Sequence, residues 1–401
     1  MGTKQDGTAA TARRPLCVID HVGNSGGGVK YVLRLLDVLR ASWDVELHAQ
    51  PAALDRYRQA AHGRSLELRQ AWPMTLPPVL ADSSTCFHAW MLRHGCGHYA
   101  WTHQVRPLAS DDSRVSFFPW LHRHDLRHFQ GRGLGVFHDA IFFQMPEMIG
   151  WNALAQETAS LHTWFDKLDK IVVTSRHTKR RLLEVAGEAW AGKVAVIPVA
   201  DSDGASNLPD LGPAATRRFG RYLVMPANTS IHKNHRVLLQ ALRASVGQWN
   251  LVLTGDGTVP EKGSAIAPLI AEFGLERRVF GLGFVGKELV ARLIADAEAL
   301  VMPTLGEGGG SFPVCEAIVA GTPVIASNLD VIEEQLGRMG AQATLFDPRN
   351  VDSLVQALDR LAANPDGFRR AAREQVARLA LRTWGDVAHD FSALLDELFP
   401  A

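Results

Sequence analysis

Apolar and polar residues follow one another along the chain in two alternating patterns, one typical of strands and one of helices. Segment 15–22 (PLCVIDHV) is a short apolar run of strand type. A glycine turn follows it, and from Val29 the apolar residues recur at helical spacing. A helix is predicted over 176–186, with Ser175 as its N-cap. Further strands of this half are predicted at 43–50, 133–139, 170–175 and 193–199.

The pattern restarts after the polar, glycine- and proline-containing segment 201–216. A helix is predicted over 235–242, and strands at 221–227, 249–257, 277–284, 299–304, 322–327 and 343–347. Strands that alternate with helices indicate an α/β fold with two doubly wound parallel-sheet domains facing a cleft. We predict five parts: a disordered leader (1–14), an N-terminal domain (15–205), a linker (206–216), a C-terminal domain (217–383) and a terminal helix (384–401).

Composition narrows the function classes. The 401 residues hold 42 Lys+Arg against 42 Asp+Glu, a balance that argues against a dedicated nucleic-acid-binding protein. Four scattered cysteines predict neither a disulfide framework nor a zinc site. No run approaches the roughly 18 apolar residues of a membrane helix, and the polar N-terminus does not resemble a secretory signal. We therefore expect a cytoplasmic protein.

The neutral total hides a basic, histidine-rich stretch between residues 86 and 138. It holds eight histidines and six arginines against three aspartates. A ligand that carries phosphate, met at a membrane surface, would suit this bias, and a solvated basic face is the alternative. We name His122, His124 and Asp139 as candidates for contact with such a ligand. The His122-x-His124 pair invites a metal hypothesis, but no Cys or carboxylate stands at a suitable spacing, so we expect no metal.

Ligands of open parallel sheets bind beyond the carboxyl ends of the strands, so chemistry is expected there. The segments concerned in the second half are Asn228–Asn234, Gly255–Gly257, Phe284–Gly286 and Leu305–Glu316. Within the last of them, Gly308–Gly310 precede a predicted helix and would present backbone N–H groups to an anion such as phosphate. Glu307 and Glu316 bracket this loop, and carboxylates are suited to the paired hydroxyls of a sugar or ribose. A flexible turn with two solvated acids is the alternative.

Three further features could take part in chemistry. Lys233 stands beside a predicted helix N-terminus and could neutralise a diphosphate as a mobile point charge. His138 ends an apolar strand and could donate to or accept from a substrate hydroxyl, unless it only caps the strand. The Gly26–Gly28 turn shows close backbone approach but does not match a dinucleotide-binding fingerprint.

Taken together, these blocks resemble glycosyltransferase family 4, the retaining nucleotide-sugar transferases of GT-B fold. The resemblance is strongest from Arg221 to Asp347, through MPANTSIHKNHRVLLQAL, LVLTGDG, FVGKELVARLIADAEALVMPTLGEGGGSFPVCEAIVAGTPVIASNLDVIEEQLG and ATLFDP. The first half is similar through its glycine turn, FHDAIFFQMPE and KIVVTSRHTKRRLLEV. RTWGDVAHDFSALLDELF resembles the closing helices, which cross back onto the first domain. The HKNH and HD-x-x-F forms are similar to transferases of mannose, rhamnose or fucose in bacterial surface polysaccharides.

The resemblance implies a role for each matching residue. His138, Lys233 and Glu307 would be catalytic, with Lys233 on the donor diphosphate and His138 facing the reacting sugar. Glu316 would bind the nucleotide ribose, and the backbone near Phe284 and Val285 would lie against the base. The full donor-binding set is Gly27, Gly28, Asn228, Lys233, Gly255, Phe284, Val285, Glu307, Gly308, Gly309, Gly310, Ser311, Phe312 and Glu316. The partners implied are a nucleotide-diphosphate sugar and a saccharide or lipid-linked acceptor, met at the inner membrane surface, with no cofactor. His122, His124 and Asp139 would lie on the acceptor side.

The sequence departs from the family in two places. Glu307 and Glu316 are nine positions apart where the family usually has eight. Ala227 and Asn228 occupy positions where the family often has an arginine before the lysine. Two alternatives to a transferase therefore stay open: an epimerase acting on nucleotide sugars, and a non-catalytic nucleotide-sugar-binding protein.

Overall fold

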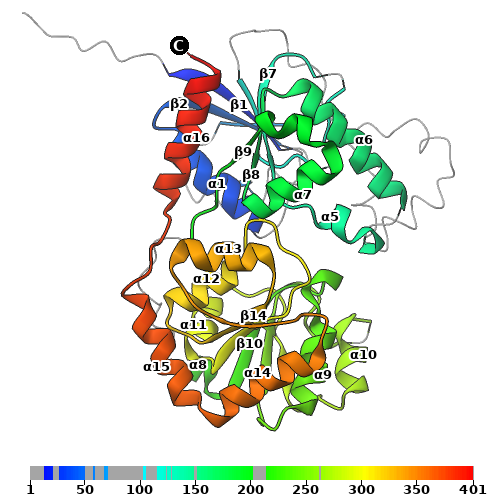
Figure 1. Cartoon of the computed structure of the whole chain (residues 1–401), viewed down its shortest axis with the longest axis vertical. Helices are drawn as coiled ribbons and strands as arrows, with labels where there is room; N and C mark the ends of the chain where they lie inside the picture. The colour runs from blue at the N-terminus through cyan, green and yellow to red at the C-terminus, as the bar shows by residue number, and fades with distance from the viewer. Residues whose placement is uncertain are drawn as a thin grey trace, which may run out of the picture.

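The computed structural model describes residues 13–20, 27–49, 57–58, 67–70, 103–104, 115–122, 124–127, 129–148, 151–201, 214–261 and 263–400. Two parallel sheets, each covered by helices, form two domains stacked along the long axis of the molecule (Figure 1). The predicted linker 206–216 falls mostly outside the described residues. The leader 1–14 does so too, except that Arg13 is described and Arg14 already belongs to the first strand.

The N-terminal sheet has seven parallel strands in the order β3-β2-β1-β5-β7-β8-β9. Its strands are β1 (Arg14–Asp20), β2 (Trp43–Ala49), β3 (Glu67–Gln70), β5 (Val115–Phe118), β7 (Arg132–Phe137), β8 (Lys170–Val173) and β9 (Val194–Val196). β4 (His103–Gln104) and β6 (His124–Asp125) pair separately. The helices of this domain are α1 (Gly27–Leu39), α5 (Ile141–Gln144), α6 (Trp151–Lys167) and α7 (Arg176–Ala186), with 3₁₀ turns η2 (Pro146–Met148) and η3 (Glu188–Lys193).

The C-terminal sheet has six parallel strands in the order β12-β11-β10-β13-β14-β15. These are β10 (Tyr222–Pro226), β11 (Asn250–Thr254), β12 (Val279–Gly281), β13 (Ala299–Met302), β14 (Val324–Ser327) and β15 (Thr344–Phe346). Its helices are α8 (Ala214–Arg217), η4 (Ile231–Lys233), α9 (His235–Ala244), α10 (Ile266–Glu272), α11 (Lys287–Asp296), α12 (Phe312–Val319), α13 (Asp330–Met339), α14 (Val351–Ala363) and α15 (Pro365–Val376). Both orders run outward from the first strand in two directions, the doubly wound arrangement that the alternating pattern predicts.

The last helix, α16 (Trp384–Leu398), returns to the N-terminal domain, as predicted (Figure 1). Trp384, Val387, Phe391 and Leu395 join the core that covers one face of the N-terminal sheet, next to α1. Thr383 caps α16 in a capping box with Asp386, so the helix begins where the chain reaches this domain.

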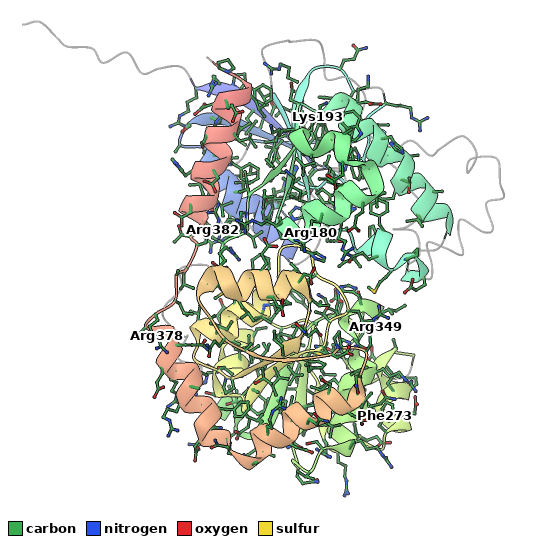
Figure 2. All side chains as sticks on the ribbon, viewed as in Figure 1. Arg180, Lys193, Phe273, Arg349, Arg378 and Arg382 are labelled. Atoms are coloured by element: carbon green, nitrogen blue, oxygen red, sulfur yellow. The ribbon has the colours of Figure 1, made fainter. Side chains whose placement is uncertain are left out.

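The two passages of the chain between the domains meet at Asp201. This buried carboxylate accepts hydrogen bonds from the Arg338 side chain (2.7 Å) and from the Arg382 backbone N–H (2.9 Å). Arg382 also pairs with Asp390 of α16. Figure 2 shows Arg382 at the junction of the two domains. Asp201 therefore ties the outgoing and the returning chain together.

Candidate functional site between the domains

Lys233 and Glu307 form an ion pair beyond the carboxyl ends of β10 and β13. The Lys233 ammonium lies 2.6 Å from Glu307 Oε1, and the two side chains are only 19% and 11% exposed. Lys233 comes from the turn after β10, and Glu307 from the loop after β13. Because parallel strands end at one edge of their sheet, residues 74 positions apart in the sequence meet there. A cation at this place could change partners, from the carboxylate to an incoming phosphate.

Asn234 fixes the turn that carries Lys233. Its backbone is in the left-handed region (φ 59°), which asparagine tolerates better than most residues. Its side-chain amide donates to the carbonyls of Pro303 (3.0 Å) and Pro348 (2.9 Å), so the turn is bound to two neighbouring loops. Asn234 closes the predicted segment Asn228–Asn234 but has no individual role in the prediction. The signal that could have identified it is an asparagine between Lys233 and the start of a helix.

The glycine loop of the C-terminal domain lies directly against the N-terminal domain. The Gly308 carbonyl accepts hydrogen bonds from Ser175 Oγ (2.7 Å) and Thr178 Oγ1 (2.9 Å) at the start of α7. A Cβ atom on Gly308 would lie 2.0 Å from the His138 carbonyl oxygen, and one on Gly309 would lie 2.8 Å from Thr174. The glycines therefore permit the two domains to approach closely, a different role from the predicted presentation of N–H groups.

The end of the loop differs from the prediction. The Ser311 N–H donates to Gln335 Oε1 (2.9 Å), Gln335 Nε2 donates back to the Ser311 carbonyl (3.2 Å), and Ser311 is buried. This N–H is therefore engaged inside the protein and does not face an anion. Phe312, predicted at the donor, packs against the core of the N-terminal domain. Glu316 is half-buried in the second turn of α12.

His138, the residue directly after β7, lies among aromatic side chains. Its ring stacks on Trp120 (4.3 Å between centroids) and meets the edge of Tyr31 (4.6 Å). Nε2 lies 2.8 Å from the Pro119 carbonyl, which can only accept, so we assign the proton to Nε2 and leave Nδ1 as an acceptor. Burial lowers the His138 pKa to about 4. Of the two predicted roles, donating to or accepting from a substrate hydroxyl, this arrangement allows acceptance.

The acceptor-side candidates lie deeper than the sequence indicates. His122 and His124 are both buried in the N-terminal domain, and His122 Nδ1 is 2.6 Å from Glu157 Oε1. Buried side chains cannot contact an acceptor directly, so we no longer assign these two histidines to that role. Asp139 is half-buried at the cleft, where it accepts from the Ile141 N–H (3.1 Å). The side chains of His88, His94, His98, His103 and His128 lie outside the described residues.

The remaining donor candidates lie around the ends of β10, β11 and β12 or on the opposite domain. Gly255 has φ +114°, and a Cβ there would lie 2.8 Å from the Asn228 nitrogen, so only glycine fits. Asn228 itself accepts from the Ser230 N–H (3.2 Å), which gives it a role in the turn. Phe284 is 76% exposed, with Val285 beside it half-buried. Gly27 and Gly28 are the first residues of α1.

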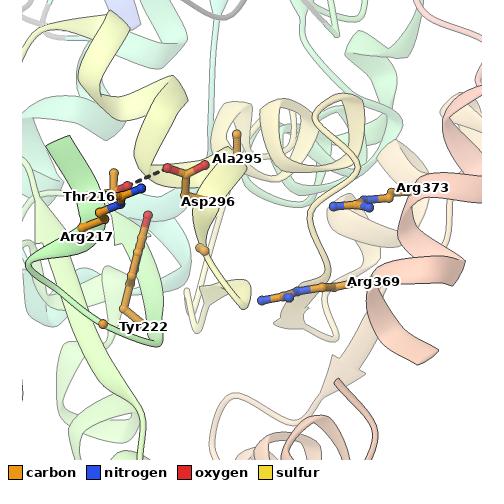
Figure 3. A pocket seen from close by; sticks show the side chains of 9 residues that line it. Thr216, Arg217, Tyr222, Ala295, Asp296, Arg369 and Arg373 are labelled. Carbon is orange, nitrogen blue, oxygen red and sulfur yellow. Dashed lines mark hydrogen bonds between the residues drawn. The ribbon is translucent and has the colours of Figure 1, made fainter. Parts of the chain in front are cut away.

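A separate cavity of about 370 Å³ lies at the amino ends of β10 and β13, away from these residues (Figure 3). Thr216 Oγ1 donates to Asp296 Oδ2 (2.6 Å), and Tyr222 donates to the Leu293 carbonyl (2.9 Å). Arg369, which Figure 3 shows opposite them, pairs with Glu298 (2.7 Å). Most polar groups of the cavity thus have partners inside the protein, and none of the predicted site residues lines the cavity.

Among the described residues, no group of three or more His, Cys, Asp or Glu side chains is placed to hold a metal ion. No helix in the same part of the chain is long and apolar enough to cross a membrane.

We expect the protein to lose stability as the pH falls from about 6.5 to about 4. Burial is the main cause that lowers the pKa of His138, His232 and His235 to about 4, from 6.5 in the unfolded chain. Between these values the unfolded chain binds more protons than the folded one, so acid favours unfolding. Urea unfolding at pH 7, 5.5 and 4 measures the effect. His235→Gln should flatten the dependence by about one proton. An unchanged slope in His235→Gln would contradict the assignment.

Parts of the chain are similar to known proteins. Residues 220–364, which carry Lys233 and both glutamates, match the family described as glycosyl transferases group 1. The chain is 35% identical to an MMP alpha-(1->4)-mannosyltransferase of Mycolicibacterium hassiacum over 130 residues, which is 32% of this chain. It is 27% identical to an O-antigen chain mannosyltransferase B of Escherichia coli over 239 residues, which is 57% of this chain. The matched parts cover 31% and 61% of these relatives, less than two thirds of either.

The whole chain also has structural neighbours. An Anabaena protein, Alr3699/HepE, solved with UDP-glucose, superimposes with a TM-score of 0.68 at 15% identity and covers 96% of this chain and 100% of its own. Identity this low shows the fold alone. The fold is GT-B, and residues 220–364 within it match the model of the glycosyl transferases group 1 family.

Proposed function

We propose that this chain transfers a hexose from a nucleotide-diphosphate sugar to a saccharide or lipid-linked saccharide, with retention of the anomeric configuration. The sugar would be of the mannose, rhamnose or fucose type and the product a bacterial surface polysaccharide. Similarity to two mannosyltransferases supports the mannose type. We also propose that the enzyme works on the cytoplasmic side, with peripheral contact to the membrane where a lipid-linked acceptor is met.

The observation that carries the proposal is the Lys233–Glu307 pair, whose Glu307 precedes Gly308, the residue that lies against His138. Charge builds up on the leaving diphosphate as its bond to the anomeric carbon breaks. Lys233 would stabilise that charge in a site shielded from water, the electrostatic effect that usually contributes most to catalysis. Glu307, released from the ion pair, would accept hydrogen bonds from the donor sugar.

Retention follows if the acceptor hydroxyl attacks the face that the diphosphate leaves. The electron pair of the breaking bond passes to the phosphate oxygen, and the acceptor oxygen forms the new bond to the anomeric carbon. The leaving phosphate takes the acceptor proton. His138, neutral and with Nδ1 as an acceptor, would orient a sugar hydroxyl and would not supply a proton. This route needs neither a protein nucleophile nor a metal ion, so we propose no cofactor.

A thermal-shift screen against GDP-, UDP- and dTDP-linked sugars tests the donor assignment. A ligand that binds only the folded protein raises the melting temperature, and we expect GDP-mannose to give the largest shift. Incubation of that donor with a saccharide acceptor, followed by NMR of the new anomeric centre, then tests transfer and retention. Consumption of the donor without an acceptor would favour an epimerase, and binding without turnover would favour a binding protein.

Glu316→Ala should raise the KM for the donor about tenfold, because a hydrogen bond to a charged group is worth about 1.5–3 kcal/mol. Its kcat should change less, since the ribose is bound equally in the ground and transition states. Initial rates over a range of donor concentrations measure both. Glu276→Ala, an exposed glutamate of the same domain, is the matched control. An unchanged KM in Glu316→Ala would remove the ribose assignment.

A further inference from the structure

A carboxylate of the C-terminal domain occupies the start of a helix in the N-terminal domain. Glu334 on α13 accepts hydrogen bonds from the backbone N–H groups of Arg176 (2.8 Å) and His177 (3.0 Å), the first two residues of α7. The Ser175 side chain caps the Thr178 N–H (2.9 Å) within the helix. The first N–H groups of a helix have no carbonyl partner within that helix. Glu334 therefore binds two such N–H groups of α7, from at least 157 positions away in the sequence.

A second acid lies one turn earlier on α13. Asp330 pairs with Arg180 (2.9 Å) and lies 3.8 Å from His177 Nδ1. Figure 2 shows Arg180 at the junction of the domains. Asp330 and Arg180 are both more than half exposed, so solvent weakens their attraction. Glu334 is half-buried, and its carboxylate makes two charge-assisted hydrogen bonds at a helix N-terminus. Glu334 is therefore the stronger of the two contacts.

The start of α7 also holds the glycine loop. Ser175 and Thr178 both donate hydrogen bonds to the Gly308 carbonyl. On α13, Gln335 follows Glu334 and forms hydrogen bonds with both the N–H and the carbonyl of Ser311 in the loop. The same end of α7 thus contacts α13 through Glu334 and the loop through Gly308. Any rotation that lifts Glu334 from the α7 amides would also draw the loop away from the end of β7, because α13 and the loop are joined through Gln335.

We infer that Glu334 is a positioning residue for the transfer reaction, an inference that rests on the proposed function. It docks the two domains so that the donor side, with Lys233 and Gly308, stands at a fixed distance from His138. Glu334 need not contact the substrate. Its effect should therefore appear in kcat and in the arrangement of the domains, with little change in the affinity of the C-terminal domain for the nucleotide.

The test compares Glu334→Ala with Glu333→Ala, its exposed neighbour on the same helix. We expect Glu334→Ala, which removes two charge-assisted hydrogen bonds, to lower kcat at least about tenfold, with the nucleotide Kd within about twofold of the unaltered protein. Small-angle X-ray scattering with GDP bound should show a larger radius of gyration. Glu334→Gln keeps one acceptor oxygen, so its kcat and its radius of gyration should lie between those of Glu334→Ala and of the unaltered protein. Glu333→Ala should behave as the unaltered protein.

Small-angle scattering and transfer activity together distinguish a failure of the proposed function from a failure of the docking role of Glu334. If the unaltered protein transfers no sugar, the proposed function fails, and the radius of gyration alone then decides whether Glu334 holds the domains. A scattering profile of Glu334→Ala identical to that of the unaltered protein would overturn the docking role. An altered profile with an unchanged kcat would overturn the positioning role. A fall in kcat shared equally by Glu333→Ala would overturn both.

Discussion

Sugar transfer should fall about a hundredfold when Gly308 is replaced by alanine, the loss that a displacement of about 1 Å can cause at an active site. The added Cβ would lie 2.0 Å from the His138 carbonyl oxygen and 2.6 Å from Asp139 Cβ. Neither contact can be relieved by a flexible side chain, because one atom is backbone and the other is the first carbon of its side chain. The loop must move away from β7, and the donor then moves away from His138.

The change should leave each domain folded, since Gly308 lies between them and not in either core. Nucleotide binding, measured by thermal shift, should therefore persist while initial rates collapse. Gly192→Ala is the matched control, because no atom lies within 4 Å of the Cβ that it would add. Transfer near the normal rate in Gly308→Ala would mean that the close approach of the domains plays no part in the reaction.

The second large effect is expected for Lys233→Ala, which should lower kcat/KM by about a hundredfold to a thousandfold. Other enzymes lose about this much activity when one donor to the anion of the transition state is removed. The variant loses the charge that faces the diphosphate. It also leaves Glu307, now without its partner at 2.6 Å, to repel the incoming phosphates. Lys233→Arg should recover only part, because a planar guanidinium does not replace a compact ammonium.

The pair also predicts how two changes combine. Because Lys233 and Glu307 are in contact, the loss in Lys233→Ala/Glu307→Ala should be smaller than the product of the two single losses. Steady-state rates of the four proteins give this coupling directly. Lys167→Ala, which removes an exposed lysine from the other domain, should have no effect. Near-normal activity in Lys233→Ala would exclude the diphosphate role.

Local signals in the sequence predicted much of this molecule. Helix α7 begins at Arg176, ends at Ala186 and is capped by Ser175, as the sequence predicts, because the cap and the apolar spacing are both local. The strands of the C-terminal sheet were found for the same reason: each is a short β-branched or apolar run beside a turn. The Lys233 turn and the Glu307 loop were named as strand ends, and parallel pairing then brings them together.

Other features depend on contacts that no local pattern reveals. β5 (Val115–Phe118) was missed although it lies beside β1 at the centre of the sheet, since four residues of mixed type are too few to show a period. Glu334 and Gln335 are polar residues of α13, and no local signal in the sequence distinguishes them. Their partners, the start of α7 and Ser311, are identified only once the domains are placed against each other.

The return of α16 has a consequence for the order in which the protein is built. One face of the N-terminal sheet is completed by Trp384, Phe391 and Leu395, which leave the ribosome after the whole C-terminal domain. The N-terminal sheet, which is synthesised first, therefore keeps apolar surface exposed until α16 has been synthesised and packs against it. The C-terminal domain contains its own core, so it can fold during that interval. The two halves are separate in space, yet the first of them can finish folding only after the second has been synthesised.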